Sequence, residues 1–143
     1  MSKTRKIAGA IALGAIMIAA GPALADKMAM KATLNGASEV PPNTTAGKGT
    51  ADVNYDTASK MLSWKVTYSG LTGPATAAHF HGPAEAGKNA GVAVPIPDIA
   101  KSPAEGSATL TDAQAADLMA GKYYVNIHTE ANKGGEIRGQ VTK

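Results

Sequence analysis

The sequence predicts an all-β protein, an antiparallel Greek-key-like β-sandwich or barrel with one short α-helix. Three observations lead to this fold class. Apolar and polar residues alternate with a period of two in several segments, as in strands that have one buried face. Glycine and proline, with 16 and 8 copies in 143 residues, separate nearly all of these segments. A single segment combines a helix start signal with helix-forming residues.

Residues 1–25 are predicted to be a cleaved signal peptide. Its basic start consists of Lys3, Arg5 and Lys6. An apolar run at residues 7–20 and a small-residue cleavage site at residues 23–25 follow it. The apolar run is shorter than the roughly 20 residues that a membrane span needs. We therefore expect a periplasmic or secreted protein whose mature chain, residues 26–143, is a single domain without a membrane span.

The composition of the predicted mature chain excludes several classes of partner. The full chain has a formal net charge of +3, and residues 26–143 contain 11 basic and 11 acidic side chains. Because no basic stripe is present, we expect no nucleic-acid binding. The chain has no cysteine, so disulfides, thiolate zinc sites and blue-copper ligation are excluded.

Eight strands are predicted. In KMLSWKVTYSG, residues 60–70, every second residue from Leu62 to Tyr68 is apolar, which is typical of a half-buried strand. The segment GTADVNY, residues 49–55, alternates in the same way, with Ala51, Val53 and Tyr55 expected to point inward, and the segment DTAS, residues 56–59, predicts a hairpin turn between the two. The other six strands are expected at residues 28–34, 76–81, 91–94, 106–110, 123–129 and 136–141.

One α-helix is predicted at about residues 112–120. Thr111 and Gln114 form a capping box, in which each side chain binds a backbone N–H group of the other residue. The segment DAQAADLMA is rich in helix-forming residues, and Gly121 follows where a helix would end.

Two of the three histidines are one residue apart in AAHFHG, residues 77–82. In a strand, His79 and His81 share a face, and Phe80 points to the opposite side. Because Phe80 is the only phenylalanine, we expect it in the core and the two histidines on the outer face.

The third histidine, His128, lies in YYVNIHTE. Val125 and Ile127 form the apolar face of this segment, so His128 lies on the opposite, polar face. If the two strands are neighbours, all three histidines converge outside the core. Imidazole side chains on alternate residues of one strand can both bind one metal ion with bonds of about 2 Å. Three imidazoles without a thiolate suit copper or zinc, and raw affinity favours copper. We therefore predict a solvent-facing metal site formed by His79, His81 and His128.

Four polar residues are candidates for a supporting role beside this site. Asn126 shares the face of His128. Glu136 and Arg138 alternate in GGEIRGQ and form a candidate ion pair, although a terminal strand with a solvated edge explains the same pattern. Glu39, in SEVPP, is a further candidate, although an edge segment that ends in a stiff turn is the simpler explanation.

Other chemistry finds little support. The segment GPAEAGKN, residues 82–89, approaches a phosphate-binding loop but lacks the Ser or Thr that should follow Lys88, and no helix pattern comes after it. We expect no nucleotide and no haem. A Gly-x-Ser-x-Gly nucleophile elbow is absent from the sequence.

The motifs LNGASEVPP, AAHFHGPA and LTDAQAADLMAGKYYVNIHTEANKGGEIRGQ together resemble the CHRD domain, first described in chordin and widespread as a small exported bacterial domain. The likeness runs from about residue 34 to residue 141. It implies a β-rich, immunoglobulin-like or barrel-like domain and no settled biochemical activity.

A fainter likeness is to copper-zinc superoxide dismutases, which also have a His-x-His strand, a distant third histidine and a late arginine. The corresponding residues here are His79, His81, His128 and Arg138. The sequence departs from that family because it lacks a zinc-binding loop, a bridging histidine and a disulfide.

Three functions follow from these patterns. The first is the binding of a transition metal ion, copper before zinc, by an exported CHRD-domain protein. The second is a metal-free structural or interaction module of the cell envelope, in which the histidines are framework and another exported protein is the partner. The third is a weak superoxide-dismutase-like redox enzyme. The sequence favours a binding protein over an enzyme.

Overall fold

The structure is a computed structural model that describes residue 21 and residues 26–143. Apart from residue 21, the predicted signal peptide lies outside the described residues, so export stays a prediction. Within the described part of the chain, no helix is long and apolar enough to cross a membrane.

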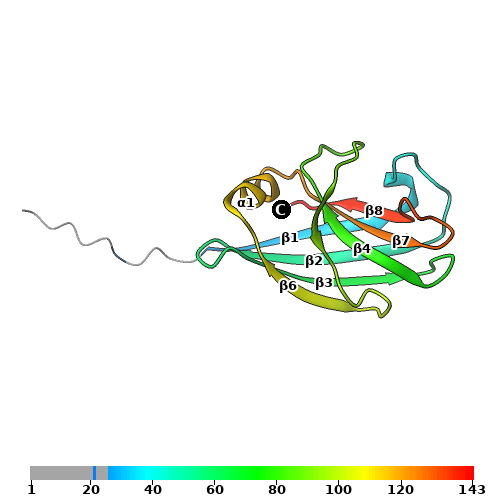
Figure 1. Cartoon of the computed structure of the whole chain (residues 1–143), viewed down its shortest axis with the longest axis horizontal. Helices are drawn as coiled ribbons and strands as arrows, with labels where there is room; N and C mark the ends of the chain where they lie inside the picture. The colour runs from blue at the N-terminus through cyan, green and yellow to red at the C-terminus, as the bar shows by residue number, and fades with distance from the viewer. Residues whose placement is uncertain (1–20, 22–25) are drawn as a thin grey trace, which may run out of the picture.

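Eight strands and two short helices follow one another along residues 26–143 (Figure 1). Each predicted strand is present, and the predicted α-helix is one residue shorter than expected. In chain order the elements are β1 (Lys27–Asn35), the 3-10 helix η1 (Gly36–Ser38), β2 (Lys48–Asp56), β3 (Met61–Ser69), β4 (Ala75–His81), β5 (Val92–Pro95), β6 (Ala104–Thr109), α1 (Asp112–Met119), β7 (Tyr124–Thr129) and β8 (Ile137–Gln140).

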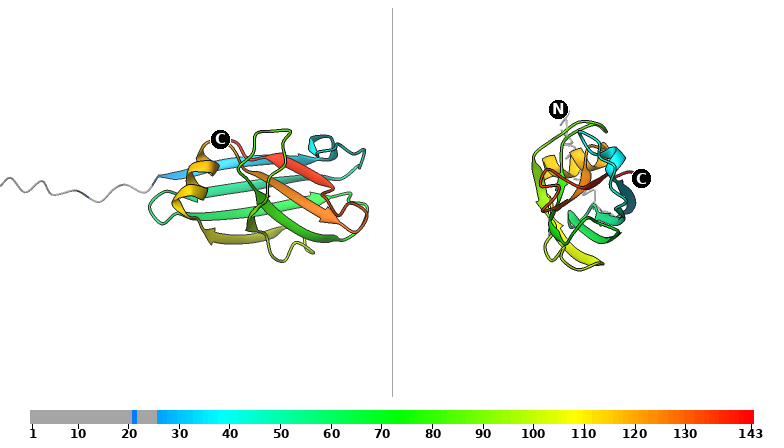
Figure 2. Two further views of the ribbon diagram at one scale, coloured as in Figure 1. Left: turned by 45° about the horizontal axis from the view of Figure 1, so that its top comes forward. Right: turned by 90° about the vertical axis from the view of Figure 1, so that its right-hand side faces the viewer.

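All eight strands belong to one sheet in the order β5-β4-β7-β8-β1-β2-β3-β6. Every neighbouring pair is antiparallel. The sheet curls into a nearly closed barrel, which is viewed along its length on the right of Figure 2. The predicted antiparallel all-β class is confirmed, and the arrangement is a barrel-like sheet.

The core lies inside this barrel and is filled by alternate residues of the strands. Trp64 and Phe80 meet edge to face with ring centroids 5.3 Å apart, and Phe80 is fully buried. The predicted inward face of the 49–55 segment is also confirmed, because Ala51, Val53 and Tyr55 are buried. Burial of a side chain the size of Val53 or Phe80 stabilises a fold by roughly 1.5–3 kcal/mol.

The outer face of the barrel is exposed to solvent on one side and covered by loops on the other. On β2, buried and exposed residues alternate, so its outer face meets solvent. On β7, residues of both parities are buried. The reason is that residues 36–45 and 82–91 fold back over β7 and β8 and form hydrogen bonds to their outward side chains. The candidate site lies on this covered side.

One expectation about GGEIRGQ is wrong. The pattern suggests a terminal strand with a solvated edge, but β8 lies between β7 and β1. Close packing of these strands requires Gly139, because a Cβ atom there would lie 2.1 Å from the carbonyl oxygen of Thr33. A period of two does not distinguish an edge strand from a central strand whose outer face is covered by loops.

The helix α1 begins with the predicted capping box, since both of its side-chain to backbone hydrogen bonds are present. Gln114 has a second role. Its Nε2 atom donates a hydrogen bond to the carbonyl oxygen of Ala93, 3.1 Å away, on the edge strand β5. Occupying an acceptor on a sheet edge in this way limits pairing with other chains.

Candidate metal centre

The pairing of β4 with β7 brings the three histidines together. His79 is opposite Asn126, His81 is opposite Tyr124, and Ala77 is opposite His128. The predicted neighbourhood of the two strands is therefore confirmed. Because Phe80 points into the barrel, both His79 and His81 lie on the outer face, where His128 joins them from the adjacent strand.

The three imidazole rings form a compact cluster. Their centroids are 5.4 Å apart for His79 and His81, 5.1 Å for His79 and His128, and 6.1 Å for His81 and His128. One nitrogen atom of each ring lies within 4.8 Å of one nitrogen atom of each of the others. The cluster is less open than the sequence suggests, because His81 is only 9% exposed.

The closest pair of nitrogen atoms is already at ligand spacing. Nδ1 of His79 lies 3.3 Å from Nε2 of His128. Two nitrogen ligands with bonds of 2.0–2.1 Å to a tetrahedral metal ion are about 3.3 Å apart. The separation of these two atoms therefore already matches that of two nitrogen ligands of one ion.

Backbone carbonyl groups fix the orientation of two of the rings. Nδ1 of His81 lies 3.0 Å from the carbonyl oxygen of Ala90, and Nδ1 of His128 lies 2.8 Å from that of Lys133. Because a carbonyl oxygen can only accept, each Nδ1 must carry a hydrogen, and in the neutral ring Nε2 then keeps its lone pair. Histidines that bind metals are usually held by such a hydrogen bond on the other nitrogen.

Nε2 of His81 is buried and has no hydrogen-bond partner among the residues that the structure describes. Leaving a buried polar atom unsatisfied costs about 1–3 kcal/mol, so such atoms are rare in folded proteins. The orphaned atom is the nitrogen that the carbonyl group of Ala90 leaves free for a ligand.

The surroundings of His79 and His81 favour the neutral form of their rings. Burial lowers the pKa of His79, and the neighbouring His128 and His81 lower it further. Burial also lowers the pKa of His81, against the opposing effect of the hydrogen bond to Ala90. Neutral imidazole is the form that binds metal ions.

Tyr124 is a neighbour of the site that sequence reasoning did not single out. Its ring stacks on His81 with centroids 5.0 Å apart and planes inclined by 2°. The guanidinium carbon of Arg138 lies 4.1 Å from the centre of the same ring. The signal available in the sequence is strand parity, which puts Tyr124 on the face of Asn126 and His128.

The ion pair beside the cluster differs from the one expected. Arg138 pairs with Glu39 and not with Glu136, and its Nε atom lies 3.2 Å from Oε2 of Glu39. Both side chains are buried. Glu39 therefore belongs to this network. Burial raises the pKa of Glu39, and the charge of Arg138 partly opposes this effect.

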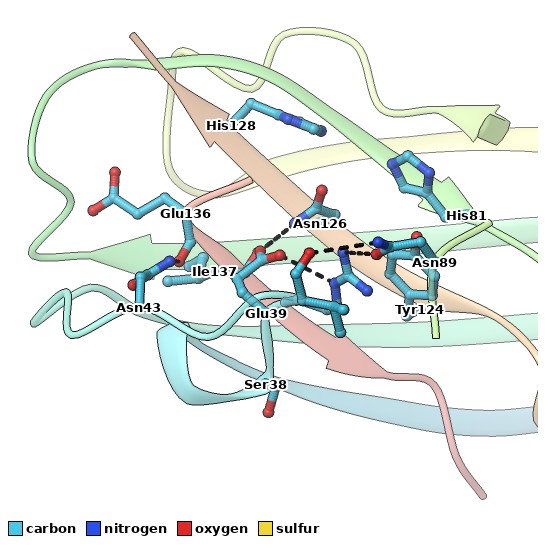
Figure 3. Close-up of polar contacts among 12 residues, drawn as sticks. Ser38, Glu39, Asn43, His81, Asn89, Tyr124, Asn126, His128, Glu136 and Ile137 are labelled. Carbon is cyan, nitrogen blue, oxygen red and sulfur yellow. Dashed lines mark hydrogen bonds and ion pairs between the residues drawn. The ribbon is translucent and has the colours of Figure 1, made fainter. Parts of the chain in front are cut away.

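Asn126 links this ion pair to the histidine face. Its Nδ2 atom donates to Glu39 and to the carbonyl oxygen of Ile137. In Figure 3, Asn126 lies between His128 and His81, and its amide nitrogen points to Glu39. The structure thus brings Glu39, Asn126 and Arg138 beside the cluster, in one hydrogen-bonded group.

Glu136 belongs to a different group. Its carboxylate accepts hydrogen bonds from the hydroxyl groups of Thr45, Thr72 and Thr129 at 2.6–2.7 Å and from the backbone N–H of Thr72. Burial acts to raise the pKa of Glu136, but these hydrogen bonds outweigh it and lower the pKa to about 2. Among the described residues, all hydrogen-bond partners of its carboxylate are threonines, so the role of this side chain is to join loops to the sheet.

The fold and the cluster define a small antiparallel barrel that carries three histidines on one covered face. The sequence model of the CHRD domain matches residues 30–141. The chain therefore belongs to the CHRD domain family, as the motifs indicate. Comparison with curated proteins and with solved structures finds no match.

Proposed function

We propose that this CHRD-domain protein binds one transition metal ion through His79, His81 and His128. The observation that carries the proposal is the buried, unpartnered Nε2 atom of His81 within a cluster of ligand-spaced imidazoles. A bound metal ion would give this atom a partner and would offset the cost of its burial.

The donor set favours copper or zinc. The cluster offers three imidazole nitrogen atoms, and the carboxylates of Glu39 and Glu136 are engaged by other side chains. Nitrogen ligands suit both metals, and copper has the higher intrinsic affinity. The 3.3 Å separation of Nδ1 of His79 and Nε2 of His128 suits tetrahedral or trigonal coordination, the geometry of zinc and of Cu(I).

The physiological role that follows is metal binding or buffering outside the cytoplasm. The location in this proposal depends on the predicted signal peptide. The absence of cysteine is compatible with it, because an oxidising compartment finds no thiol to oxidise in such a chain.

A metal-free structural module is the second candidate. It is favoured by the hydrogen bonds of His81 to Ala90 and of His128 to Lys133, since these bonds also attach two loops to the sheet. This function leaves the orphaned Nε2 atom of His81 unexplained, so we rank it second.

A superoxide-dismutase-like enzyme is not proposed. Such an enzyme would use the arginine to attract an anion to the metal. Here Arg138 is 5% exposed and paired with Glu39, so its charge is neutralised inside the protein.

The test is titration of the purified protein with Cu(II) and Zn(II) by calorimetry, with electron paramagnetic resonance of the copper form. We expect one equivalent to bind, with hyperfine splitting from nitrogen ligands. His128→Ala should lower the affinity by more than the 10–100-fold typical of losing a supporting hydrogen bond. Thr50→Ala, an exposed position on β2, is the matched control. An affinity no higher than that of an unstructured peptide would exclude the metal site.

A further inference from the structure

We infer that Tyr124 and Arg138 are positioning residues that orient His81 by fixing residues 82–91, an inference that rests on the proposed metal site. Neither side chain is a ligand. Each acts through the carbonyl group of Ala90, which holds Nδ1 of His81.

The first step of this inference concerns the segment itself. Residues 82–91 connect β4 to β5, and most of them are exposed. Exposed connections of this kind are mobile unless side chains attach them to the sheet. The direction of the carbonyl group of Ala90, and with it the orientation of His81, therefore depends on those attachments.

Tyr124 attaches the segment at Ala90. Its hydroxyl group accepts a hydrogen bond from the N–H of Ala90 at 3.1 Å and lies 3.3 Å from the carbonyl oxygen, to which it donates. The same tyrosine ring stacks on His81. One side chain thus determines both the plane of the imidazole ring and the place of its hydrogen-bond partner.

Arg138 attaches the two preceding residues. It donates from one terminal nitrogen to the carbonyl oxygen of Lys88 at 3.2 Å, and from the other to Oδ1 of Asn89 at 2.8 Å. Its guanidinium group also lies against Tyr124, and Glu39 holds its Nε atom. A lysine cannot replace these contacts, because it has no planar fork of donors and stacks poorly on a ring.

The consequence is a chain of contacts from β8 to the ligand atom. Arg138 fixes the positions of Lys88 and Asn89. Together with Tyr124, these two residues fix the position of Ala90. The carbonyl group of Ala90 in turn keeps the hydrogen of His81 on Nδ1. Nε2 then remains free of hydrogen and correctly aimed. Without these contacts we expect His81 to populate both tautomers and several ring orientations.

The experiment uses Tyr124→Phe, which keeps the stacked ring but removes the hydroxyl group, and Arg138→Lys. Tyr68→Phe is the matched control, because it removes a tyrosine hydroxyl that donates to a carbonyl oxygen, that of Ile99, and not to residues 82–91. The first readout is the tautomer of His81 in the metal-free protein, from nitrogen NMR shifts. The second is the copper spectrum and affinity.

We expect wild-type His81 to hold its hydrogen on Nδ1, and both variants to shift it towards a mixture. Their copper affinity should fall about 10–100-fold with unchanged stoichiometry, while Tyr68→Phe alters neither readout. If Arg138→Lys does not fold, Asn89→Ala removes one of its attachments at an exposed position and should cause a smaller shift in the same direction.

The inference is overturned if Tyr124→Phe and the folded Arg138 or Asn89 variant match the control in both tautomer and copper spectrum. Failure of the proposed function gives a different result. Wild type would then bind no metal, while the tautomer measurement in metal-free protein would still decide whether Tyr124 and Arg138 orient His81.

Discussion

With both rings neutral, Nδ1 of His79 donates a hydrogen bond to Nε2 of His128 across strands β4 and β7, with the two atoms 3.3 Å apart. The direction of this bond follows from the carbonyl group of Lys133, which requires the hydrogen of His128 on Nδ1. In the metal-free protein the two rings therefore hold each other at ligand spacing by means of one hydrogen, which a metal ion must replace.

Zinc binding should accordingly move the hydrogen of His79 from Nδ1 to Nε2, because Nδ1 is the atom nearest to the lone pair of His128. Nitrogen NMR shifts of the three histidines before and after addition of one equivalent of zinc measure this change. A His79 that keeps its hydrogen on Nδ1 in the zinc form would contradict the prediction, and would mean that its ring turns to bind through Nε2.

His81→Phe should abolish metal binding with little loss of stability. The change keeps a flat ring against Tyr124 and removes the orphaned nitrogen, whose burial costs about 1–3 kcal/mol. It also removes the hydrogen bond to Ala90, which contributes about 1 kcal/mol. We expect the free energy of unfolding of the metal-free protein to stay within about 1 kcal/mol of wild type in urea titrations.

The metal-free framework function predicts a different effect of zinc on stability. If His81 serves only to hold residues 82–91, one equivalent of zinc should leave the free energy of unfolding unchanged in wild type and in His81→Phe alike, whereas a metal ion bound by the three histidines should stabilise wild type alone. Urea titrations with and without zinc therefore separate the two functions.

Glu136 should make the protein sensitive to acid. Its pKa falls from the usual 4.5 to about 2 in the folded protein, so the folded state binds its proton more weakly than the unfolded state does. This contribution, about 3 kcal/mol, is present above pH 4.5 and is lost as the pH falls to about 2. In urea unfolding at a series of pH values, the advantage of wild type over Glu136→Gln should shrink across that interval.

Glu105→Gln is the control for this pH dependence, since Glu105 is exposed on β6 and only 3.8 Å from an exposed lysine. Surface pairs of this kind contribute about 1 kcal/mol or less. A constant difference between wild type and Glu136→Gln from pH 5 to pH 2 would show that the threonine hydroxyl groups do not select the ionised carboxylate.

The buried pair of Glu39 and Arg138 should behave as one unit. Glu39→Gln or Arg138→Met alone leaves a buried charge without its partner, which costs about 3–5 kcal/mol. The double variant should cost clearly less than the sum of the two, by at least about 1 kcal/mol. Additive losses in urea unfolding would show that the two side chains are stabilised independently.

The sequence predicts those features that depend on local periodicity. Alternation locates the strands, and a capping box at Thr111 locates the helix. Parity on two strands separates Phe80 from the histidines. Only the neighbourhood of β4 and β7, a long-range relationship, had to be assumed, and it is confirmed.

The features that the sequence does not predict depend on contacts between distant segments. Glu39 and Arg138 are 99 positions apart, and nothing in the residues around either one selects the other as its partner over Glu136. The burial of His81 and Tyr124 likewise depends on how residues 82–91 fold back, which Gly and Pro content alone leaves open. Periodicity identifies faces, but the loops that cover a face are determined by tertiary packing.

The hydrogen bond from Gln114 to Ala93 has a consequence for self-association. The same side chain completes the capping box of α1 and occupies an acceptor on the edge strand β5. Val92, the preceding residue of that strand, is 56% exposed. If α1 frays, an open strand edge and an apolar side chain become available together, the combination through which sheets of separate molecules join. The concentration at which this protein stays monomeric should therefore depend on the stability of a helix of about two turns.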